Sequence, residues 1–286
     1  IFLREYLDTK IKTKGDILKK IAVPFIGEIP KSATSNEVIT VNNRSASAEA
    51  IRMVRTNLDF ILGNIAEDKC KTIFVTSSIP KEGKTFVSVN LAATIALTSK
   101  KVLIIGMDVR NPKLERYMKL PEKGLTNYLA KAGEDIHDYI VKIDGYDNFY
   151  VLPSGVIPPN PVELLISDKT AQLFDLLKKE FDYIIVDTPP VSLVTDTLLV
   201  AKNADAFIYV IRANYLDKIM LGFIGDLYKE NKLPHMSVLL NDTDLGKTYG
   251  YGYGYGYGYG YGYGYGAEQE KKNWFSGLKG KLFGKK

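Results

Sequence analysis

The chain has 286 residues, of which 45% are hydrophobic and 25% are charged, a balance that is ordinary for a soluble globular protein. Its single cysteine, Cys70, excludes a disulfide within the chain, and its net charge of +5 is too small to indicate binding to nucleic acid. No uncharged apolar run reaches the about 18 residues that a membrane-spanning helix needs.

The N-terminal part of the chain is basic and is followed by one clear helical pattern. Residues 1–30 are mixed in character and end in PFIGEIP. Residues 45–65 predict an amphipathic helix, because apolar residues recur there at helical spacing and form one stripe. The stripe consists of Ile51, Val54, Leu58 and Ile61. A separate arc of about 120° on the same helix carries Glu49, Arg52 and Arg55.

Beyond residue 70 the pattern changes to short apolar runs that alternate with helix-like stretches. The predicted strands are Thr72–Ser77, Lys101–Gly106, Asn148–Pro153, Tyr183–Asp187, Ala206–Arg212 and Met236–Asn241. Near-continuous apolar strands that alternate with helices are typical of a doubly wound, mostly parallel sheet, so we predict an α/β fold. Ligands of such sheets bind beyond the carboxyl ends of the strands.

The C-terminal part of the chain has no core pattern. Nine tyrosines alternate there with glycine: Tyr249, Tyr251, Tyr253, Tyr255, Tyr257, Tyr259, Tyr261, Tyr263 and Tyr265. Because half of this run is glycine, which weakens a strand, we predict a flexible, disordered tail over residues 246–286. Its basic end, NWFSGLKGKLFGKK, is compatible with a helix on an anionic membrane and with a solvated tail, and the sequence leaves both open.

A phosphate-binding loop follows the first strand of the sheet region. The segment SIPKEGKT fits the pattern G-x-x-x-x-G-K-[ST], except that Ser78 replaces the first glycine. Gly83 lets the backbone approach a phosphate closely, Lys84 supplies positive charge, and the Thr85 hydroxyl can hold Mg²⁺. We therefore expect Mg²⁺ with ATP or ADP to bind at Ser78, Ile79, Pro80, Lys81, Glu82, Gly83, Lys84, Thr85 and Phe86.

Two aspartates at strand ends complete the predicted nucleotide site. Asp187 ends the strand YIIVD, and Asp108 lies just past another strand and precedes Arg110 by two residues. Carboxylates at strand ends behind a phosphate loop are suited to hold its metal ion, so we expect both to act with Lys84 in catalysis. Arg110 and Asn241, which ends the last strand, are candidate contacts to the nucleotide.

Taken in order, these motifs resemble the bacterial tyrosine kinases of polysaccharide export. The resemblance rests on a Walker A motif with an internal proline (SSIPKEGKT), a Walker A′ motif (GMDVR), a Walker B motif (IIVDTPP), an ExxRxxR helix (EAIRMVR) and a tyrosine-rich C-terminus. It covers almost the whole chain. It implies a P-loop kinase that uses ATP to phosphorylate its own C-terminal tyrosines.

The resemblance also implies an organisation and partners. Residues 1–30 would be a juxtamembrane segment, 31–245 the kinase domain and 246–286 the substrate tail, on the cytoplasmic side of a bacterial inner membrane. The expected partners are copies of the chain in a ring held by Glu49, Arg52 and Arg55, the membrane machinery that sets polysaccharide length, and a cognate tyrosine phosphatase. The chain begins at Ile1 rather than methionine, so we expect a longer protein with its membrane segment upstream.

One position departs from the family pattern, and two other functions stay open. Gly106 stands where the family's first Walker A′ aspartate is expected, so the general base could be Asp108 or another group. A regulatory ATPase of the MinD/ParA type has a similar fold, but its signature lysine is replaced here by Ile79. The remaining alternative is a nucleotide-gated scaffold without enzymatic activity, whose tail is an adhesive low-complexity segment.

Overall fold

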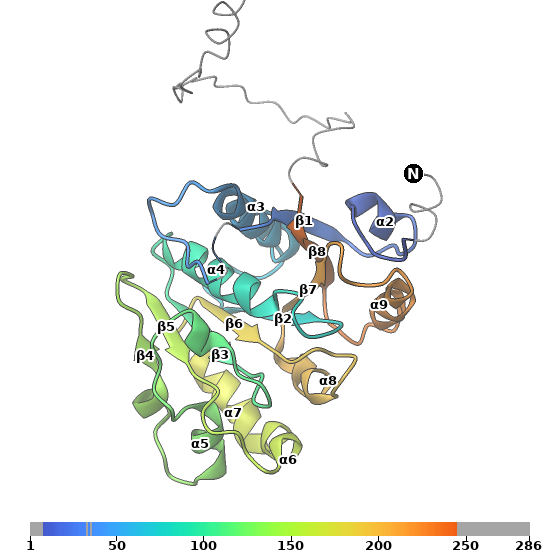
Figure 1. Cartoon of the computed structure of the whole chain (residues 1–286). Helices are drawn as coiled ribbons and strands as arrows, with labels where there is room; N and C mark the ends of the chain where they lie inside the picture. The colour runs from blue at the N-terminus through green and yellow to red at the C-terminus, as the bar shows by residue number, and fades with distance from the viewer. Residues whose placement is uncertain (1–7, 33, 35, 245–286) are drawn as a thin grey trace, which may run out of the picture. The chain divides into compact units, whose positions relative to one another are not determined.

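The computed structural model describes residues 8–32, 34 and 36–244, so the predicted tail with its tyrosines lies outside the described part. Within that part, eight strands form one sheet in the order β1-β8-β7-β2-β6-β3-β5-β4 (Figure 1). The strands are β1 (Phe25–Pro30), β2 (Lys71–Ser77), β3 (Val102–Gly106), β4 (Val141–Lys142), β5 (Phe149–Leu152), β6 (Tyr183–Asp187), β7 (Ala206–Arg212) and β8 (Met236–Thr243). The α-helices are α2 (Lys14–Leu18), α3 (Ala46–Ile61), α4 (Lys84–Ala96), α5 (Leu125–Ala130), α6 (Pro161–Leu165), α7 (Asp168–Leu177), α8 (Asp196–Val200) and α9 (Met220–Lys229), and 3-10 turns span Leu114–Arg116, Ile136–Tyr139 and Ala201–Asn203.

All six predicted strands are present, and their ends differ from the prediction by at most two residues. Neighbouring strands are parallel except β4, which pairs antiparallel with β5. The side chains of β2 alternate between the faces of the sheet, so that Phe74 enters one hydrophobic cluster while Ile73 and Val75 enter the other. Both faces are buried, which confirms the predicted doubly wound α/β fold.

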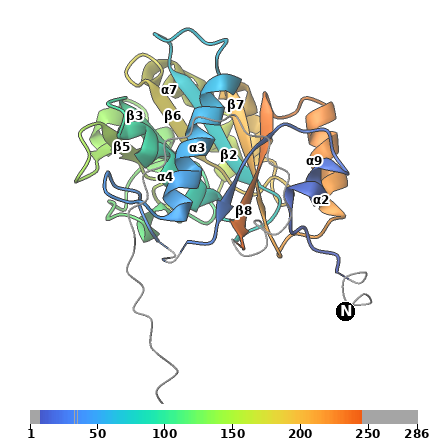
Figure 2. The same cartoon turned by 90° about the horizontal axis from the view of Figure 1, so that it is seen from above.

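Each face of the sheet is covered by its own set of helices. Helices α3 and α4 bring their buried side chains to one face, and Figure 2 shows them side by side. Helices α2, α5, α6, α7 and α9 bring theirs to the opposite face. This arrangement leaves the carboxyl ends of the parallel strands free to carry polar loops, which is where the predicted motifs lie.

The N-terminal stretch, which we assigned to a juxtamembrane segment, contributes to the sheet. Its strand β1 pairs with β8, and the Ile11 backbone N–H donates to the Leu216 carbonyl at 2.9 Å. Gly27 lies so close to α3 that a Cβ atom there would come within 2.8 Å of Val54. The residues described include no helix long and apolar enough to cross a membrane. The domain limits stay a prediction.

Helix α3 agrees with the predicted amphipathic pattern. Ser45 caps it, because its hydroxyl accepts from the Ala48 N–H at 3.2 Å. The expected stripe faces the core, where Ile51, Val54 and Leu58 are buried. The helix therefore presents its charged arc away from the sheet.

Candidate functional site

The phosphate loop joins β2 to α4 and has the backbone that a phosphate cradle needs. Gly83 and Lys81 both have positive φ, at 94° and 69°, so the chain turns sharply before α4 begins at Lys84. A Cβ atom on Gly83 would lie 2.1 Å from the Asn241 amide nitrogen. Glycine is therefore required at this position both by its dihedral angle and by its neighbour.

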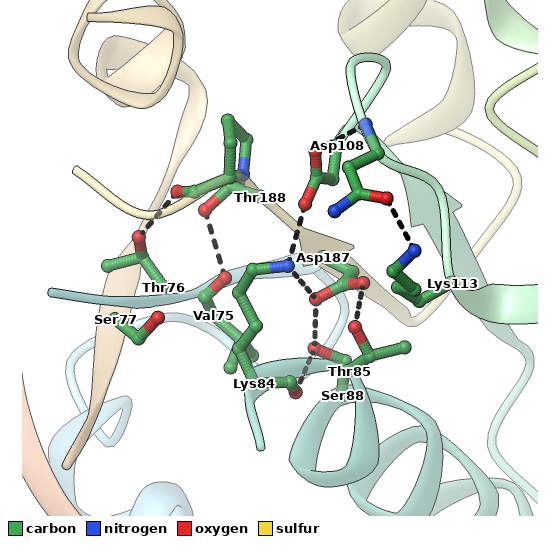
Figure 3. Close-up of polar contacts among 12 residues, drawn as sticks. Val75, Thr76, Ser77, Lys84, Thr85, Ser88, Asp108, Lys113, Asp187 and Thr188 are labelled. Carbon is green, nitrogen blue, oxygen red and sulfur yellow. Dashed lines mark hydrogen bonds and ion pairs between the residues drawn. The ribbon is translucent and has the colours of Figure 1, made fainter. Parts of the chain in front are cut away.

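Lys84 is the centre of a buried ion network at the end of this loop. Its Nζ lies 2.8 Å from Asp108 Oδ2 and 4.0 Å from Asp187 Oδ1 (Figure 3). The three side chains are 10%, 8% and 2% exposed, respectively. Burial disfavours the charge of Lys84, but the carboxylates of Asp187 and Asp108 outweigh it and raise the pKa of the lysine. The structure thus brings together the three residues that we predicted to be catalytic.

Asp187 is held by hydrogen bonds from α4 and itself positions the loop after β3. The Thr85 hydroxyl donates to its Oδ2 at 2.7 Å, and the Ser88 hydroxyl donates to its Oδ1 at 3.3 Å. Its carbonyl accepts from the N–H groups of Met107 and Asp108 at 2.8 and 3.0 Å. Burial raises the pKa of the Asp187 carboxyl, and the nearby Lys84 opposes that shift. Ser88 was not predicted as a site residue, although it lies one helical turn after Lys84.

A cavity of about 590 Å³ opens above this network. It is lined by Asn36, Pro80, Lys81, Gly83, Lys84, Thr85, Phe86, Asp108, Arg110, Asn111, Lys113, Arg116, Tyr117, Pro189, Pro190, Leu193, Val194 and Arg212. Most of the predicted nucleotide-binding residues are in this set. Residues 111–117 and 191–194 of the cavity wall were not predicted, because no local motif marks them, whereas Pro189 and Pro190 belong to the Walker B motif.

Four predicted nucleotide contacts are not among the residues that line the cavity, namely Ser78, Ile79, Glu82 and Asn241. The Glu82 carboxylate is buried and accepts from the Ile79 N–H at 2.8 Å, and burial raises the pKa of Glu82 to about 7. Asn241 donates its amide to the Glu82 carbonyl at 3.0 Å, and its contact to the nucleotide stays a prediction. The Ser78 hydroxyl lies 2.9 Å from the Tyr209 hydroxyl. The side chains of Ser78, Glu82 and Asn241 therefore form hydrogen bonds that hold the conformation of the phosphate loop.

Arg110 lines the cavity but already has a partner. Its guanidinium binds both oxygens of the buried Asp196 at 2.8 and 3.0 Å. The Asn111 N–H donates to Asp108 Oδ1 at 3.1 Å. Residues 108–111, which follow β3, are therefore held by two separate contacts. Bidentate pairs of this kind hold both groups in a defined geometry.

Gly106, the departure from the family pattern, is tightly enclosed. A Cβ atom there would lie 2.5 Å from the Ser154 hydroxyl and 3.0 Å from both Leu114 Cδ1 and the Ser154 N–H. Ser154 thus occupies the space that a longer side chain would need. Among the described residues that line the cavity, Asp108 is the only acidic one.

Comparisons with known proteins agree with this site. A family model described as an AAA domain matches residues 70–225. Tyrosine-protein kinase CpsD of Streptococcus agalactiae serotype III (strain NEM316) is 32% identical over 222 residues, which cover 76% of this chain and 93% of CpsD. Tyrosine-protein kinase Etk of Escherichia coli (strain K12) is 37% identical over 176 residues, which cover 61% of this chain but only 24% of Etk.

A comparison with solved structures also finds a tyrosine kinase. The kinase domain of Escherichia coli Etk superposes with a TM-score of 0.73 at 26% identity, covering 87% of this chain and 100% of that domain. The similarity therefore extends over the sheet and the helices on both of its faces. Together with the sequence similarity to CpsD over most of both chains, it shows that the chain belongs to the bacterial tyrosine-protein kinases.

Proposed function

We propose that the chain transfers the γ-phosphoryl group of ATP to the tyrosines of its own C-terminal tail, residues 249–265. The observation that carries this proposal is the network of Lys84, Asp108 and Asp187 at the floor of the cavity. Nine glycine-spaced phenols on the same chain supply a substrate with little steric demand. A phosphate loop alone would fit many functions, and the tail is what favours a tyrosine kinase.

The residues present fit a nucleotide with Mg²⁺. The Thr85 hydroxyl and the Asp187 carboxylate are 2.7 Å apart and would hold the metal ion, with Asp108 beside them. When bound, Mg²⁺ neutralises charge on the phosphate oxygens. Lys84, released from its carboxylates, would then stabilise the transferring phosphoryl group.

Asp108 is the proposed general base. A phenol has a pKa of about 10 and is a weak nucleophile until its proton is removed. In the proposed step the phenolic oxygen bonds to the γ-phosphorus, the bond between that phosphorus and ADP breaks, and the proton passes to Asp108. The hydrogen bond from Asn111 to Asp108 keeps the carboxylate in place.

Helix α3 would mediate transfer between copies of the chain in a ring. Arg52 pairs with Glu49 at 2.6 Å and donates to the Asn43 carbonyl, while Arg55 donates to the Thr94 carbonyl. Although both arginines have partners within the chain, Glu49 is mostly exposed. The outer face of α3 is therefore available to contact another copy. Phosphorylation of nine tyrosines adds roughly −14 to −18 charges, against a net charge of +5. We expect this charge to dissociate the ring.

The same proposal extends to the cellular setting. The domain would act at the cytoplasmic face of a bacterial inner membrane, regulate the polymerisation and export of a polysaccharide, and be reset by a tyrosine phosphatase. The support is the membership of the chain in a family whose members include CpsD and Etk.

Incubation with Mg-ATP separates the kinase from its alternatives. The kinase should produce phosphotyrosine on the purified chain, and Lys84→Met should abolish it. Hydrolysis of ATP without phosphotyrosine would favour the MinD/ParA-like switch, and neither activity would favour the scaffold. For transfer between copies, a chain with all nine tail tyrosines changed to phenylalanine should label the Lys84→Met chain. No label in that mixture would contradict the trans step.

A further inference from the structure

The cavity carries more positive charge than a nucleotide site requires. Its cationic lining residues are Lys81, Lys84, Arg110, Lys113, Arg116 and Arg212, and Asp108 is the acid among the lining residues described. Lys84 pairs with Asp108, Arg110 with Asp196, and Arg212 with Asp242. Among the residues that the structure covers, Lys81, Lys113 and Arg116 form no ion pair, and Lys81 belongs to the phosphate loop.

Lys113 and Arg116 line the same cavity as the phosphate loop and belong to the segment after β3. They follow β3 on either side of the buried Leu114, which anchors this short turn in the core. The Lys113 ammonium donates to the Asn111 side-chain oxygen, and the Asn111 backbone N–H donates to Asp108 (Figure 3). Lys113 is thus linked to the proposed base through Asn111, and both cations line the cavity that the acceptor tyrosine would enter.

The spacing of the tail determines what lies next to an acceptor tyrosine. In an extended chain residues two apart point to the same side and are separated by about 6.5–7 Å. Once one tyrosine of the Tyr-Gly run is phosphorylated, each adjacent tyrosine has a phosphate of about −1.5 to −2 charge at that distance. With the acceptor held at Asp108, that phosphate would lie in the same cavity, which Lys113 and Arg116 also line.

We propose that Lys113 and Arg116 form a subsite for a phosphotyrosine two residues from the acceptor, so that each phosphate on the tail promotes the next. This inference rests on the proposed function and names its preferred substrate, a partly phosphorylated Tyr-Gly segment. The apolar side chain of Leu193, exposed on the adjoining wall, offers a surface for the acceptor ring.

Two peptides test the subsite. Both have the sequence of residues 250–258, and one carries phosphotyrosine at position 253. The enzyme is the full chain with its nine tail tyrosines changed to phenylalanine. We expect kcat/KM to be about three- to tenfold higher for the phosphorylated peptide, as two partly exposed ion pairs allow, and the advantage to shrink at high salt.

Matched variants assign the effect to the two cations. The ratio of the two kcat/KM values should fall toward one in Lys113→Ala/Arg116→Ala and stay unchanged in Lys119→Ala/Lys123→Ala, whose cations lie on the same segment outside the cavity. A ratio of one in the parent enzyme, or a ratio that survives Lys113→Ala/Arg116→Ala, would overturn the inference. A loss of affinity for ATP with an unchanged ratio would assign the cations to the nucleotide. If neither peptide is phosphorylated, the proposed function itself fails.

Discussion

Lys84 neutralises two carboxylates that lie almost out of reach of water. Replacing it with methionine leaves Asp108 and Asp187 without their cation. We expect Lys84→Met to lower the free energy of unfolding by about 1–3 kcal/mol near neutral pH, because buried charges then lose their partner. The same change should reduce tyrosine phosphorylation at least about 100-fold, because the transferring phosphoryl group loses an electrostatic stabiliser.

The stability deficit of Lys84→Met should depend on pH. Burial already raises the pKa of Asp187, and loss of Lys84 should raise it further. A carboxyl with a raised pKa binds its proton more tightly in the native state, so stability falls as pH rises from the unfolded pKa through the folded one. Urea unfolding should therefore show a smaller deficit at about pH 5 than at about pH 8. Lys100→Met, an exposed control, should show no deficit at either pH, and an equal deficit of Lys84→Met at both would contradict the charge argument.

Ser154 fills the space beside Gly106, so we expect a larger side chain at position 106 to destabilise the fold. Gly106→Ala should lower the free energy of unfolding by about 1–3 kcal/mol, as overpacking of a core does. Combining it with Ser154→Ala removes the 2.5 Å contact and should restore part of the loss. Urea unfolding of the single and double variants measures this coupling. Additive effects of the two changes would show that Ser154 is not what limits the space.

At the scale of residues, local motifs predicted the centre of the site but not its walls. Lys84, Asp108 and Asp187 were predicted because each lies in a local motif at or after the end of a strand. Asp196 and Tyr117 were not predicted. Only the tertiary fold brings Asp196 to Arg110 and Tyr117 to the cavity. The burial of Glu82 behind the phosphate loop was not predicted either, because it depends on β7, a strand distant in sequence whose Arg212 N–H donates to the Glu82 carboxylate.

At the scale of elements, helix α3 has an apolar pair on its outer face. Met53 and Phe60 are 67% and 80% exposed and lie seven residues apart, two helical turns, on the same side as Glu49. Exposed apolar side chains on one face are typical of an interface. If α3 holds the proposed ring, Met53→Ser/Phe60→Ser should lower the mass that light scattering reports for nucleotide-bound Lys84→Met protein.

The control for this prediction is Ile219→Ser, another exposed apolar residue that lies outside α3. It should leave the mass unchanged. Neither set of changes should alter the stability of the monomer by more than about 0.5 kcal/mol, since the side chains are exposed. An unchanged mass for Met53→Ser/Phe60→Ser would contradict a ring built on this face.

Element prediction succeeded where strands are buried on both faces and failed at the edges of the sheet. The central strands are continuous apolar runs, so their periodicity and length identify them. The edge strand β1 contains Gly27, Glu28 and Pro30, which obscure the pattern, and its pairing with β8 is a long-range contact. Strand β4 has only two residues, too few for any periodic signal.

At the scale of the whole molecule, the fold brings distant segments of the described chain together at the cavity. The parallel sheet brings the phosphate loop, the segment after β3 and the segment after β6 to one edge, although about 100 residues of sequence separate the first from the last. We propose that this edge phosphorylates tyrosines 249–265.

Mapping of phosphotyrosine by tandem mass spectrometry tests that claim most directly. The purified chain, Lys84→Met and the Lys100→Met control are each incubated with Mg-ATP and digested. We expect phosphate on the tyrosines of residues 249–265 in the parent chain and in Lys100→Met, and none in Lys84→Met. Phosphate absent from the tail of the parent chain, or present at the same level in Lys84→Met, would contradict it.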